Sequence, residues 1–306
     1  MTDAPFKEAD AASYDDHAEA YAHFVPRLAG PLAEEIVSLA ALAPGDRVLD
    51  VGCGTGLASV AAAAAVAPYG SVVGVDLSRG MLAAAARRLE QAPDGRLVEL
   101  RRMDAERLEL PDGAFDAVVS LCAVLHFPEL GQALREMRRV LVPGGRLVVA
   151  FGSGRPNAPF ALAAYAPRRL ARLLVARMRP ELRAPERLIA IAERNAPEPP
   201  EPVLTPWASR RPLPHLLRSV RAAGFEVART SWKGSDVRFT SPQELWEAQL
   251  AIATEVRKRL ADADERVVER VRAAFEAEAG RVLDRRGRLV YPYGATFVSA
   301  RKLSQG

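Results

Sequence analysis

Three carboxylates stand at the ends of short apolar segments, and a glycine-rich run surrounds the first of them. Residues 48–56 read Val-Leu-Asp-Val-Gly-Cys-Gly-Thr-Gly and contain Asp50, while Asp76 and Asp104 follow the next two apolar segments. Glycine lets the backbone turn sharply and approach a ligand without a Cβ in the way. A helix that starts after such a turn offers unpaired N–H groups to a polar ligand. The run therefore predicts a nucleotide-binding turn.

The spacing within this run distinguishes between nucleotide ligands. Its glycines follow the pattern GxGxG, whereas nicotinamide-binding turns use GxGxxG. Asp50 precedes the first glycine by two residues, a position that suits a ligand with a cationic centre and an amino group and is unfavourable beside a pyrophosphate. Asp76 is placed to accept hydrogen bonds from both hydroxyls of a ribose, and Asp104 would lie near an adenine amino group. A tight strand–helix turn without a ligand is the alternative.

Alternating strand and helix patterns must position these groups. Strands are predicted at 47–51, 71–75, 97–102, 115–121 and 146–151, with helices at 57–67, 79–91 and 129–141. Short apolar strands without polar alternation are buried on both faces, which implies a parallel sheet covered by helices. A helix at 213–223 and strands at 225–232 and 289–302 follow later in the chain, and residues 13–42 predict one or two amphipathic helices broken near Pro26 and Pro31. We therefore expect an α/β fold.

Composition excludes several other classes of protein. The net charge is +4, but the basic residues are scattered and pair locally with acids, so we expect no nucleic-acid partner. Cys53 and Cys122 are too few for a disulfide framework, and no spacing predicts a metal site. The longest apolar run, at 60–68, is too short for a membrane span, and the N-terminus has no secretory signal. We expect a soluble, cytoplasmic protein, and a homodimer is compatible with the sequence.

Several segments together resemble one enzyme family. The segments 48–56, 72–78, 103–106, 115–120 and 134–147 are similar, in this order, to class I S-adenosylmethionine-dependent methyltransferases. The resemblance is greatest to the ubiquinone/menaquinone-biosynthesis-type and small-molecule methyltransferase group. It implies a Rossmann-like, doubly wound sheet of seven strands in the order 3-2-1-4-5-7-6, with the last strand antiparallel. It also implies S-adenosyl-L-methionine as the cofactor and a small-molecule methyl acceptor.

The resemblance further implies which residues hold the cofactor. Asp50 and the glycine loop would lie near the methionine moiety, and Asp76 would bind the ribose. Leu77 would pack by the adenine, and Asp104 and Ala105 would meet its edge. Ser120 and Leu121 would lie under the cofactor, and residues 14–21 resemble a segment that folds over it. The complete predicted set is Tyr14, Tyr21, Asp50, Gly52, Cys53, Gly54, Gly56, Asp76, Leu77, Met81, Asp104, Ala105, Ser120 and Leu121.

A general base is needed only where the methyl acceptor must lose a proton, since methyl transfer otherwise requires mainly alignment of the reactants. His126 follows the fourth strand, near the expected position of the methyl group, and is the candidate base; a packing role is the alternative. The family often has two adjacent histidines here, whereas this chain has Leu-His-Phe at 125–127. For His17, His23 and His215 we expect structural or exposed roles.

The acceptor site is expected in the segments that a minimal fold of this type lacks. We expect an N-terminal helical segment over the cofactor (1–45), a cofactor-binding core (46–154), and a lid insertion (155–211). A core helix with strand six (212–235), a helical insertion (236–286) and the last core strand (287–306) would complete the chain. Ligands of open α/β sheets bind at the carboxyl ends of the strands, and long inserts at that rim are usually functional. The two insertions are therefore predicted to form a helical lid over the site.

The side chains of this lid leave the acceptor's chemistry open. Its aromatic residues suggest an apolar or aromatic acceptor such as a quinone precursor, although helix packing explains them as well; they are Phe151, Phe160, Tyr165, Trp207, Trp232, Phe239 and Trp246, with Tyr291 and Tyr293 on the final strand. Arg155, Arg168 and Arg169 would instead suit an anionic acceptor. Two alternatives to a methyltransferase remain: a non-catalytic module that binds the cofactor or assists assembly, and a nicotinamide-dependent oxidoreductase, which the GxGxG spacing disfavours.

Overall fold

The computed structural model describes residues 4–153, 180–197, 205, 207–208, 212–261 and 263–303. Its centre is one sheet with the strand order β3-β2-β1-β4-β5-β8-β6, and β7 pairs with β8 outside this path. The first five strands run parallel, and β8 is antiparallel to both β5 and β7. The strands are β1 (Arg47–Val51), β2 (Ser71–Asp76), β3 (Val98–Arg102), β4 (Phe115–Leu121), β5 (Leu141–Gly152), β6 (Glu181–Arg183), β7 (Phe225–Phe239) and β8 (Arg288–Lys302).

This order confirms the predicted Rossmann-like sheet and adds one strand to it. The predicted sixth and seventh strands are β7 and β8, and β8 lies between β5 and β7 as expected. The additional strand is β6, a three-residue strand in the predicted lid insertion that pairs in parallel with the start of β8. The sequence also predicts a helix at 167–178, and these residues lie outside the described part of the chain.

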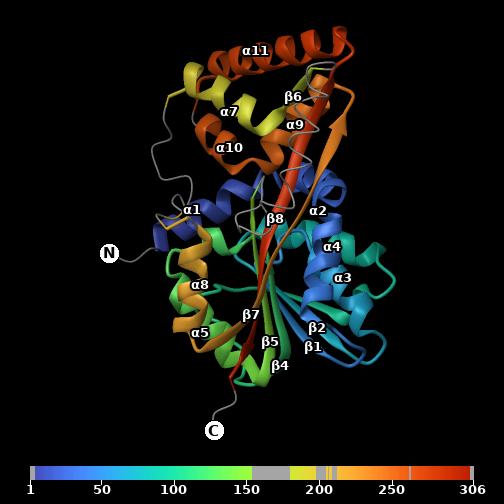
Figure 1. Ribbon diagram of the computed structural model, residues 1–306, viewed down its shortest axis with the longest axis vertical. Helices are drawn as coiled ribbons and strands as arrows, with labels where there is room; N and C mark the ends of the chain where they lie inside the picture. Colours follow the sequence, from blue (N-terminus) through green and yellow to red (C-terminus); the bar gives the residue numbers. More distant parts are fainter. Residues whose placement is uncertain are drawn as a thin grey trace.

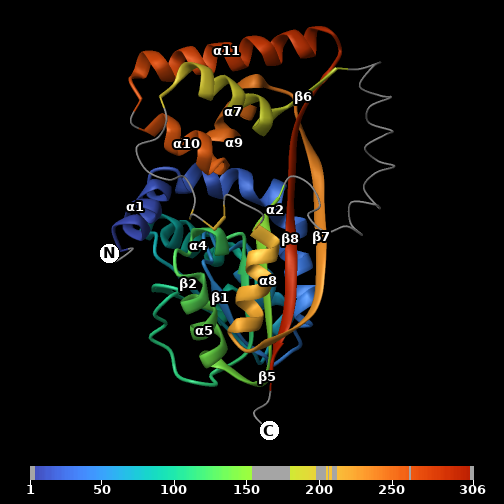
Figure 2. The ribbon, with the colours of Figure 1, turned by 60° about the vertical axis from the view of Figure 1, so that its left-hand side comes forward.

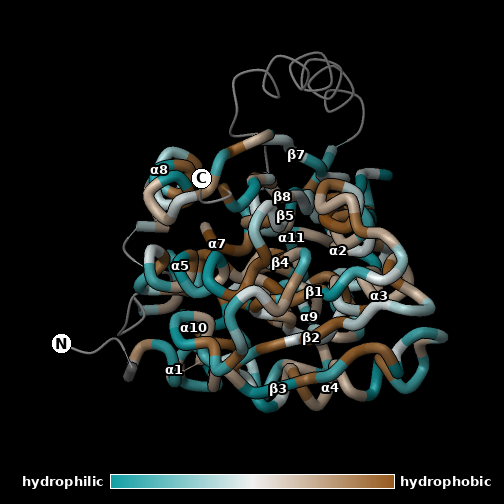
Figure 3. The backbone as a smooth tube through the Cα atoms, turned by 90° about the horizontal axis from the view of Figure 1, so that it is seen from below, coloured by the Kyte–Doolittle hydropathy of each residue, from teal (hydrophilic) through white to brown (hydrophobic). Residues whose placement is uncertain are grey.

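Helices cover both faces of the sheet. Figure 3 shows α2 and α3 on one side of the strands and α5 and α8 on the other. The helices are α1 (Ala4–Asp15), α2 (Ala18–Ala40), α3 (Leu57–Val66), α4 (Arg79–Gln91), α5 (Leu130–Val140), α7 (Ala184–Asn195), α8 (Pro212–Ala222), α9 (Pro242–Ile252), α10 (Thr254–Ala261) and α11 (Glu265–Asp284), with short 3-10 turns η1 (Gly95–Leu97) and η2 (Val124–His126). Of these, none is both long and apolar enough to cross a membrane.

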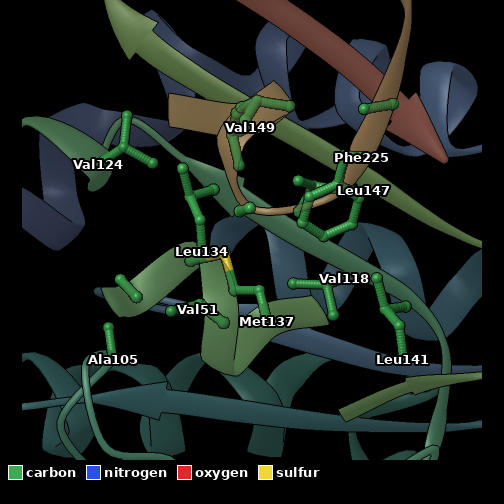
Figure 4. Packing of buried hydrophobic residues seen from close by; sticks show 14 of the residues in the cluster. Val51, Ala105, Val118, Val124, Leu134, Met137, Leu141, Leu147, Val149 and Phe225 are labelled. Atoms are coloured by element: carbon green, nitrogen blue, oxygen red, sulfur yellow. The ribbon is translucent and has the colours of Figure 1, made fainter. Parts of the chain in front are cut away.

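The two-residue period of the strands divides their side chains between two cores. In β1, Val48 belongs to the cluster under α2 and α3, whereas Leu49 belongs to the cluster under α5 and α8. Figure 4 shows this second cluster, in which Leu134 and Met137 of α5 pack against strand residues, both with no exposed surface. Because the central strands are buried on both faces, their carboxyl ends are held rigidly at one edge of the sheet.

Helix α2 runs through Pro26 and Pro31, so the predicted break at these prolines is wrong. Proline lacks the N–H that would bond the carbonyl four residues earlier. For Pro26 that carbonyl is on Ala22, and Arg88 of α4 donates to it instead at 3.0 Å. The apolar face of α2, including the fully buried Ile36, packs along the sheet and outweighs the local preference of proline.

Strands β7 and β8 extend beyond β5 and carry a second group of helices, which we call the upper lobe. It consists of α7, α9, α10, α11 and β6, at the top of Figure 1. β7 was predicted to end at Trp232 but continues to Phe239, and Ser241 then caps α9 by accepting from the N–H of Glu244. The lobe has its own apolar cluster with Trp246 and Phe275 at its centre. Figures 1 and 2 show α1 and α2 between the upper lobe and the lower part of the sheet.

Candidate functional site

A cavity lies at the carboxyl ends of β1, β2 and β4, below the upper lobe. It holds about 1100 Å³ of space not filled by atoms, part of it open to solvent. The glycine loop, the ends of these strands, α1, α2 and the start of β8 all contribute to its wall. Its lining includes thirteen of the fifteen predicted site residues: Tyr14, Tyr21, Asp50, Gly52, Cys53, Gly54, Asp76, Leu77, Met81, Asp104, Ala105, Leu121 and His126.

The other two predicted residues, Gly56 and Ser120, do not line this cavity. Gly56 is the residue before α3, with φ of +76°, and a Cβ there would lie 3.2 Å from that of Ala85. Its lack of a side chain thus serves the packing of α3 against α4. Ser120 is fully buried in β4, and its neighbour Leu121 lines the cavity because successive strand residues face opposite ways.

The glycine loop meets the cavity with bare backbone. Gly52 has φ of +70°, and a Cβ on it would lie 2.3 Å from the Cβ of Ala123. Gly54 has φ of +52° with nothing within 4 Å of its Cβ position, so the space beside it is open. The N–H groups of Gly52 and Cys53 donate to the carbonyl of Val75 at 2.8 and 3.0 Å, which fixes the loop to the end of β2.

Asp76 organises the loop from the end of β2. Its Oδ2 accepts from the N–H of Gly54 at 2.8 Å, and its Oδ1 accepts from the N–H of Ser78 at 2.9 Å. Burial raises the pKa of this carboxyl, and the backbone N–H groups oppose that rise. Each carboxylate oxygen can accept more than one hydrogen bond, so both remain able to bind ligand hydroxyls.

Asp50 is a fully buried carboxyl with one oxygen unpaired. Ser59 on α3 donates to Oδ2 at 2.6 Å, while Oδ1 has no hydrogen-bond partner among the described residues. Burial raises the pKa of Asp50 to about 7. A buried carboxylate needs a charged or hydrogen-bonding partner, and a cationic ligand in the cavity would provide one. Sequence reasoning missed Ser59; its place in the first turns of the helix after the glycine loop was the available signal.

Asp104 lies at the far wall of the cavity, where Lys7 bridges it to Glu106. The Lys7 Nζ lies 2.6 Å from both carboxylates, and Asp104 Oδ1 also accepts from the N–H of Glu106 at 2.9 Å. Burial lowers the pKa of Lys7, but the two carboxylates raise it more. Sequence reasoning missed Lys7, because nothing in its neighbourhood along the chain indicates a partner about one hundred residues away.

His126 lines the cavity and is held by helix α1. Its Nδ1 lies 2.8 Å from Oδ2 of Asp10, and its Nε2 lies 3.4 Å from the hydroxyl oxygen of Tyr14. That hydroxyl is also 2.9 Å from Oγ1 of Thr254. The other oxygen of Asp10, Oδ1, pairs with Nζ of Lys258 on α10 at 2.5 Å. The structure therefore brings the predicted base together with a carboxylate that the sequence did not indicate.

Three tyrosines, from α1, α2 and β8, line the cavity. Tyr14 and Tyr21 meet edge to face at 6.3 Å, and Tyr293 of β8 also lines the cavity. Burial raises the pKa of all three phenols. The guanidinium of Arg257 lies 4.0 Å from the centre of the Tyr14 ring, and its Nη1 donates to the carbonyl of Ala251. Aromatic rings thus form this part of the cavity wall, and the buried cation Arg257 packs against one of them.

Neither cysteine has the environment of a nucleophile. Burial raises the pKa of Cys122 to about 12 and that of Cys53 well above its ordinary value. Cys53 lies within the glycine loop as a small buried side chain. Within the residues that the structure describes, no three His, Cys, Asp or Glu side chains gather to hold a metal ion.

The remaining histidines have packing contacts. His23 meets Phe24 edge to face at 4.7 Å, and His215 stacks on Trp207 at 5.0 Å. For His17, burial lowers the pKa, with Arg257 contributing in the same direction.

Most of the aromatic residues expected in the lid pack away from the cavity. Phe239 and Trp246 belong to the core of the upper lobe, and Phe151 to the core under α5 and α8. The indoles of Trp207 and Trp232 donate to the carbonyls of Phe127 and Ser153. Tyr291 lies in the core of the upper lobe, and the other predicted acceptor candidates, at positions 155, 160, 165, 168 and 169, lie outside the described residues.

Comparison with known proteins identifies the central segment. Residues 49–149 match the family model described as a methyltransferase domain. Over 114 residues the chain is 42% identical to demethylmenaquinone methyltransferase of Symbiobacterium thermophilum, a match that covers 37% of this chain and 45% of the relative. Over 123 residues it is 36% identical to 2-phytyl-1,4-naphtoquinone methyltransferase of Synechococcus elongatus, covering 40% and 52%. The matches thus span about half the length of these curated relatives.

Solved structures share the fold over most of the chain. The YcgJ protein of Bacillus subtilis aligns with a TM-score of 0.53 and 16% identity, covering 89% of this chain and 98% of its own. The [4+2]-cyclase SpnF aligns with a TM-score of 0.51 and 24% identity, covering 90% and 82%. At such identities the likeness concerns the fold alone.

Proposed function

We propose that this chain transfers a methyl group from S-adenosylmethionine to a small-molecule acceptor, because residues 49–149 match the family model of a methyltransferase domain. The observation that carries the proposal is the fully buried Asp50. Its Oδ1 has no hydrogen-bond partner among the described residues, and it lies at the wall of a cavity that the glycine loop and Asp76 also line. A ligand that is cationic at one end and carries ribose hydroxyls in its middle satisfies both carboxylates. A pyrophosphate beside Asp50 would be repelled.

Each part of the cavity has a role in this proposal. S-adenosylmethionine supplies an activated methyl group bonded to a cationic sulfur. Asp50 attracts the cationic methionine end, and Gly54 lets the ligand approach the backbone. Asp76 accepts hydrogen bonds from the ribose, and the neighbourhood of Asp104 takes the adenine edge. Among the chain's own groups, His126 is our candidate to accept a proton from the acceptor.

The acceptor is proposed to be quinone-like, aromatic or another secondary metabolite with an apolar ring. Two observations support this class. The wall beyond the glycine loop contains Leu121, Cys122, Tyr21 and Tyr293, which suit a flat apolar molecule better than a highly charged one. The relatives named above act, by their names, on demethylmenaquinone and on 2-phytyl-1,4-naphtoquinone.

We also propose a function for each segment of the chain. Residues 46–154 bind the cofactor, while 1–45, 155–211 and 236–286 cover it and select the acceptor; 212–235 and 287–306 complete the core. A cytoplasmic location, independence from nucleic acid and association as a homodimer belong to the same proposal. Sedimentation equilibrium checks the last of these, and a single species with the mass of one chain would exclude it.

Calorimetric titration with S-adenosylhomocysteine and, in parallel, with NAD tests the central proposal. We expect S-adenosylhomocysteine to bind and NAD not to bind. Binding of NAD alone would refute the proposal and favour an oxidoreductase. Binding of S-adenosylhomocysteine, with no methyl transfer from the labelled cofactor to any member of a quinol and phenol library, would instead support a non-catalytic binding module.

A further inference from the structure

Asp10 lies where three distant parts of the chain meet. It belongs to α1 and is only 6% exposed. Its Oδ2 lies 2.8 Å from Nδ1 of His126, which ends the turn after β4, and its Oδ1 lies 2.5 Å from Nζ of Lys258 on α10 in the upper lobe. A carboxylate this buried is uncommon unless it is paired, and both of its oxygens are engaged.

We propose that Asp10 is a positioning residue that keeps Nδ1 of His126 protonated, so that Nε2 presents its lone pair as the proton acceptor. The inference rests on the proposed function, in which His126 takes a proton from the methyl acceptor. An ionised carboxylate can only accept hydrogen bonds, so the ring nitrogen that faces it must carry a proton. In a neutral imidazole the other nitrogen then carries the lone pair.

The charge state of Asp10 agrees with this role. Burial raises the pKa of the carboxyl, but His126 and Lys258 lower it more, so the net pKa lies below the ordinary value. The group is therefore ionised at neutral pH. Lys258 contributes a second positive neighbour that holds the carboxylate in place when the imidazole is neutral.

Nε2 is available for a proton. Its nearest described polar neighbour is the hydroxyl of Tyr14 at 3.4 Å, longer than an ordinary O–H···N bond, and this hydroxyl has a shorter contact of 2.9 Å to Thr254. Asp76, at the end of β2, also interacts electrostatically with His126. The imidazole is thus surrounded by Asp10 and Tyr14 from α1, Asp76 from the sheet, and Lys258 acting through Asp10.

This arrangement identifies the class of acceptor as one that must lose a proton, such as a phenol, an enol or an enolisable carbon. The acceptor atom forms a bond to the methyl carbon, and the bond from that carbon to sulfur breaks with its electron pair remaining on sulfur. The proton of the acceptor passes to Nε2 of His126. The imidazolium that results is stabilised by the carboxylate of Asp10, which receives no proton itself. An acceptor that is already an anion would make no use of this pair.

Substitution of Asp10 by asparagine tests the inference because Lys258 determines the orientation of the new side-chain amide. The ammonium group of Lys258 requires an oxygen at its side, so the amide NH₂ should face His126. That NH₂ donates, and Nδ1 must then offer a lone pair, which moves the imidazole proton to Nε2. A serine-protease triad shows the same consequence when its aspartate is replaced by asparagine, as a wrong tautomer with nearly intact geometry.

The tautomer is read from the ¹⁵N chemical shifts of histidine-labelled protein at about pH 8, where an ordinary histidine is neutral. His126→Asn assigns the signals by their loss. We expect the Nδ1-protonated form in the wild type and the Nε2-protonated form in Asp10→Asn. Glu8→Gln is the matched control, since it removes another α1 carboxylate, paired with Arg102 at 3.1 Å on the surface, and should leave the tautomer unchanged.

The outcomes separate the inference from the proposed function. An Nε2-protonated His126 in the wild type overturns the inference without any variant, and an unchanged tautomer in folded Asp10→Asn overturns it as well. S-adenosylhomocysteine binding by the wild type is measured in parallel. Failure of that binding, with the expected tautomers present, would reject the proposed function while leaving the Asp10–His126 pair as described.

Discussion

Replacing Gly54 with alanine should weaken cofactor binding far more than it weakens the fold. Gly54 has φ of +52° and no atom within 4 Å of its Cβ position, so an added methyl group meets only the space of the cavity. The left-handed backbone costs alanine roughly 1–2 kcal/mol, of which about 0.4–1 kcal/mol is returned because the unfolded chain loses freedom. The net loss of stability is therefore roughly 1 kcal/mol.

Gly113 provides a matched control for this substitution. It has φ of +60°, again with nothing within 4 Å of its Cβ position, but it lies in a turn outside the cavity lining. Both alanine variants should lower the unfolding midpoint by roughly 2 °C, given the usual unfolding entropy per residue. Only Gly54→Ala should lose affinity for S-adenosylhomocysteine, by at least about tenfold or about 1.4 kcal/mol.

Thermal unfolding and calorimetric titration with S-adenosylhomocysteine, carried out on both variants, test this prediction. Equal affinity in Gly54→Ala and Gly113→Ala would show that the ligand does not contact the glycine loop, and the reasoning from bare backbone would fail. A much larger loss of stability in Gly54→Ala alone would show instead that the space beside it is needed by the protein.

Three further substitutions test the carboxylates and one helix. Asp76→Ala should weaken S-adenosylhomocysteine binding by about 1–3 kcal/mol because buried polar groups lose their partner; wild-type affinity by calorimetry would refute its ribose role. Asp50 has a pKa of about 7 against an ordinary 3.8, so the folded state binds more protons than the unfolded state between these values and stability should fall as pH rises through that window. Asp50→Asn should remove this fall in stability. The free energy of unfolding is measured in urea between pH 4 and 7, and the same dependence on pH in the variant as in the wild type would contradict the prediction. Arg88→Met should cost about 1–3 kcal/mol by leaving the carbonyl of Ala22 unpaired. The cost should shrink in a Pro26→Ala background, which restores an N–H, and strictly additive effects in a double-mutant cycle would argue against this compensation.

Most residues at the sheet edge of the cavity could be predicted because their positions depend on a local pattern repeated along a parallel sheet. Asp50, Asp76 and Asp104 each follow a recognisable strand, and parallel strands bring their carboxyl ends to one edge. The positions of Leu121 and His126 could be predicted for the same reason, because they lie at and just after the end of β4. Ser120 does not line the cavity whereas Leu121 does, because the register of a strand end decides which of two neighbouring side chains faces the cavity.

The groups that cover the cavity could not be predicted in this way. Lys7 and Asp10 lie on an ordinary amphipathic helix, and Lys258 lies in a charge-rich segment typical of a solvated helix face. Their importance depends on where α1 and α10 pack: α1 lies against α4, and α10 packs within the apolar cluster of the upper lobe. Pro26 of α2 was misleading for a related reason, because a tertiary donor, Arg88, replaces the missing local one.

The long pairing of β7 with β8 makes three helices of the upper lobe, α9, α10 and α11, an insertion within a single hairpin. Phe239 lies opposite Leu289 in the ladder, so the chain leaves the sheet and returns to it at neighbouring points. A segment whose ends are already held together can change in length and sequence at small entropic cost. The helical segment between these two residues could therefore be replaced as one unit. A shorter or unrelated segment between Phe239 and Leu289 would alter what covers the cavity while leaving the glycine loop and the neighbouring carboxylates unchanged.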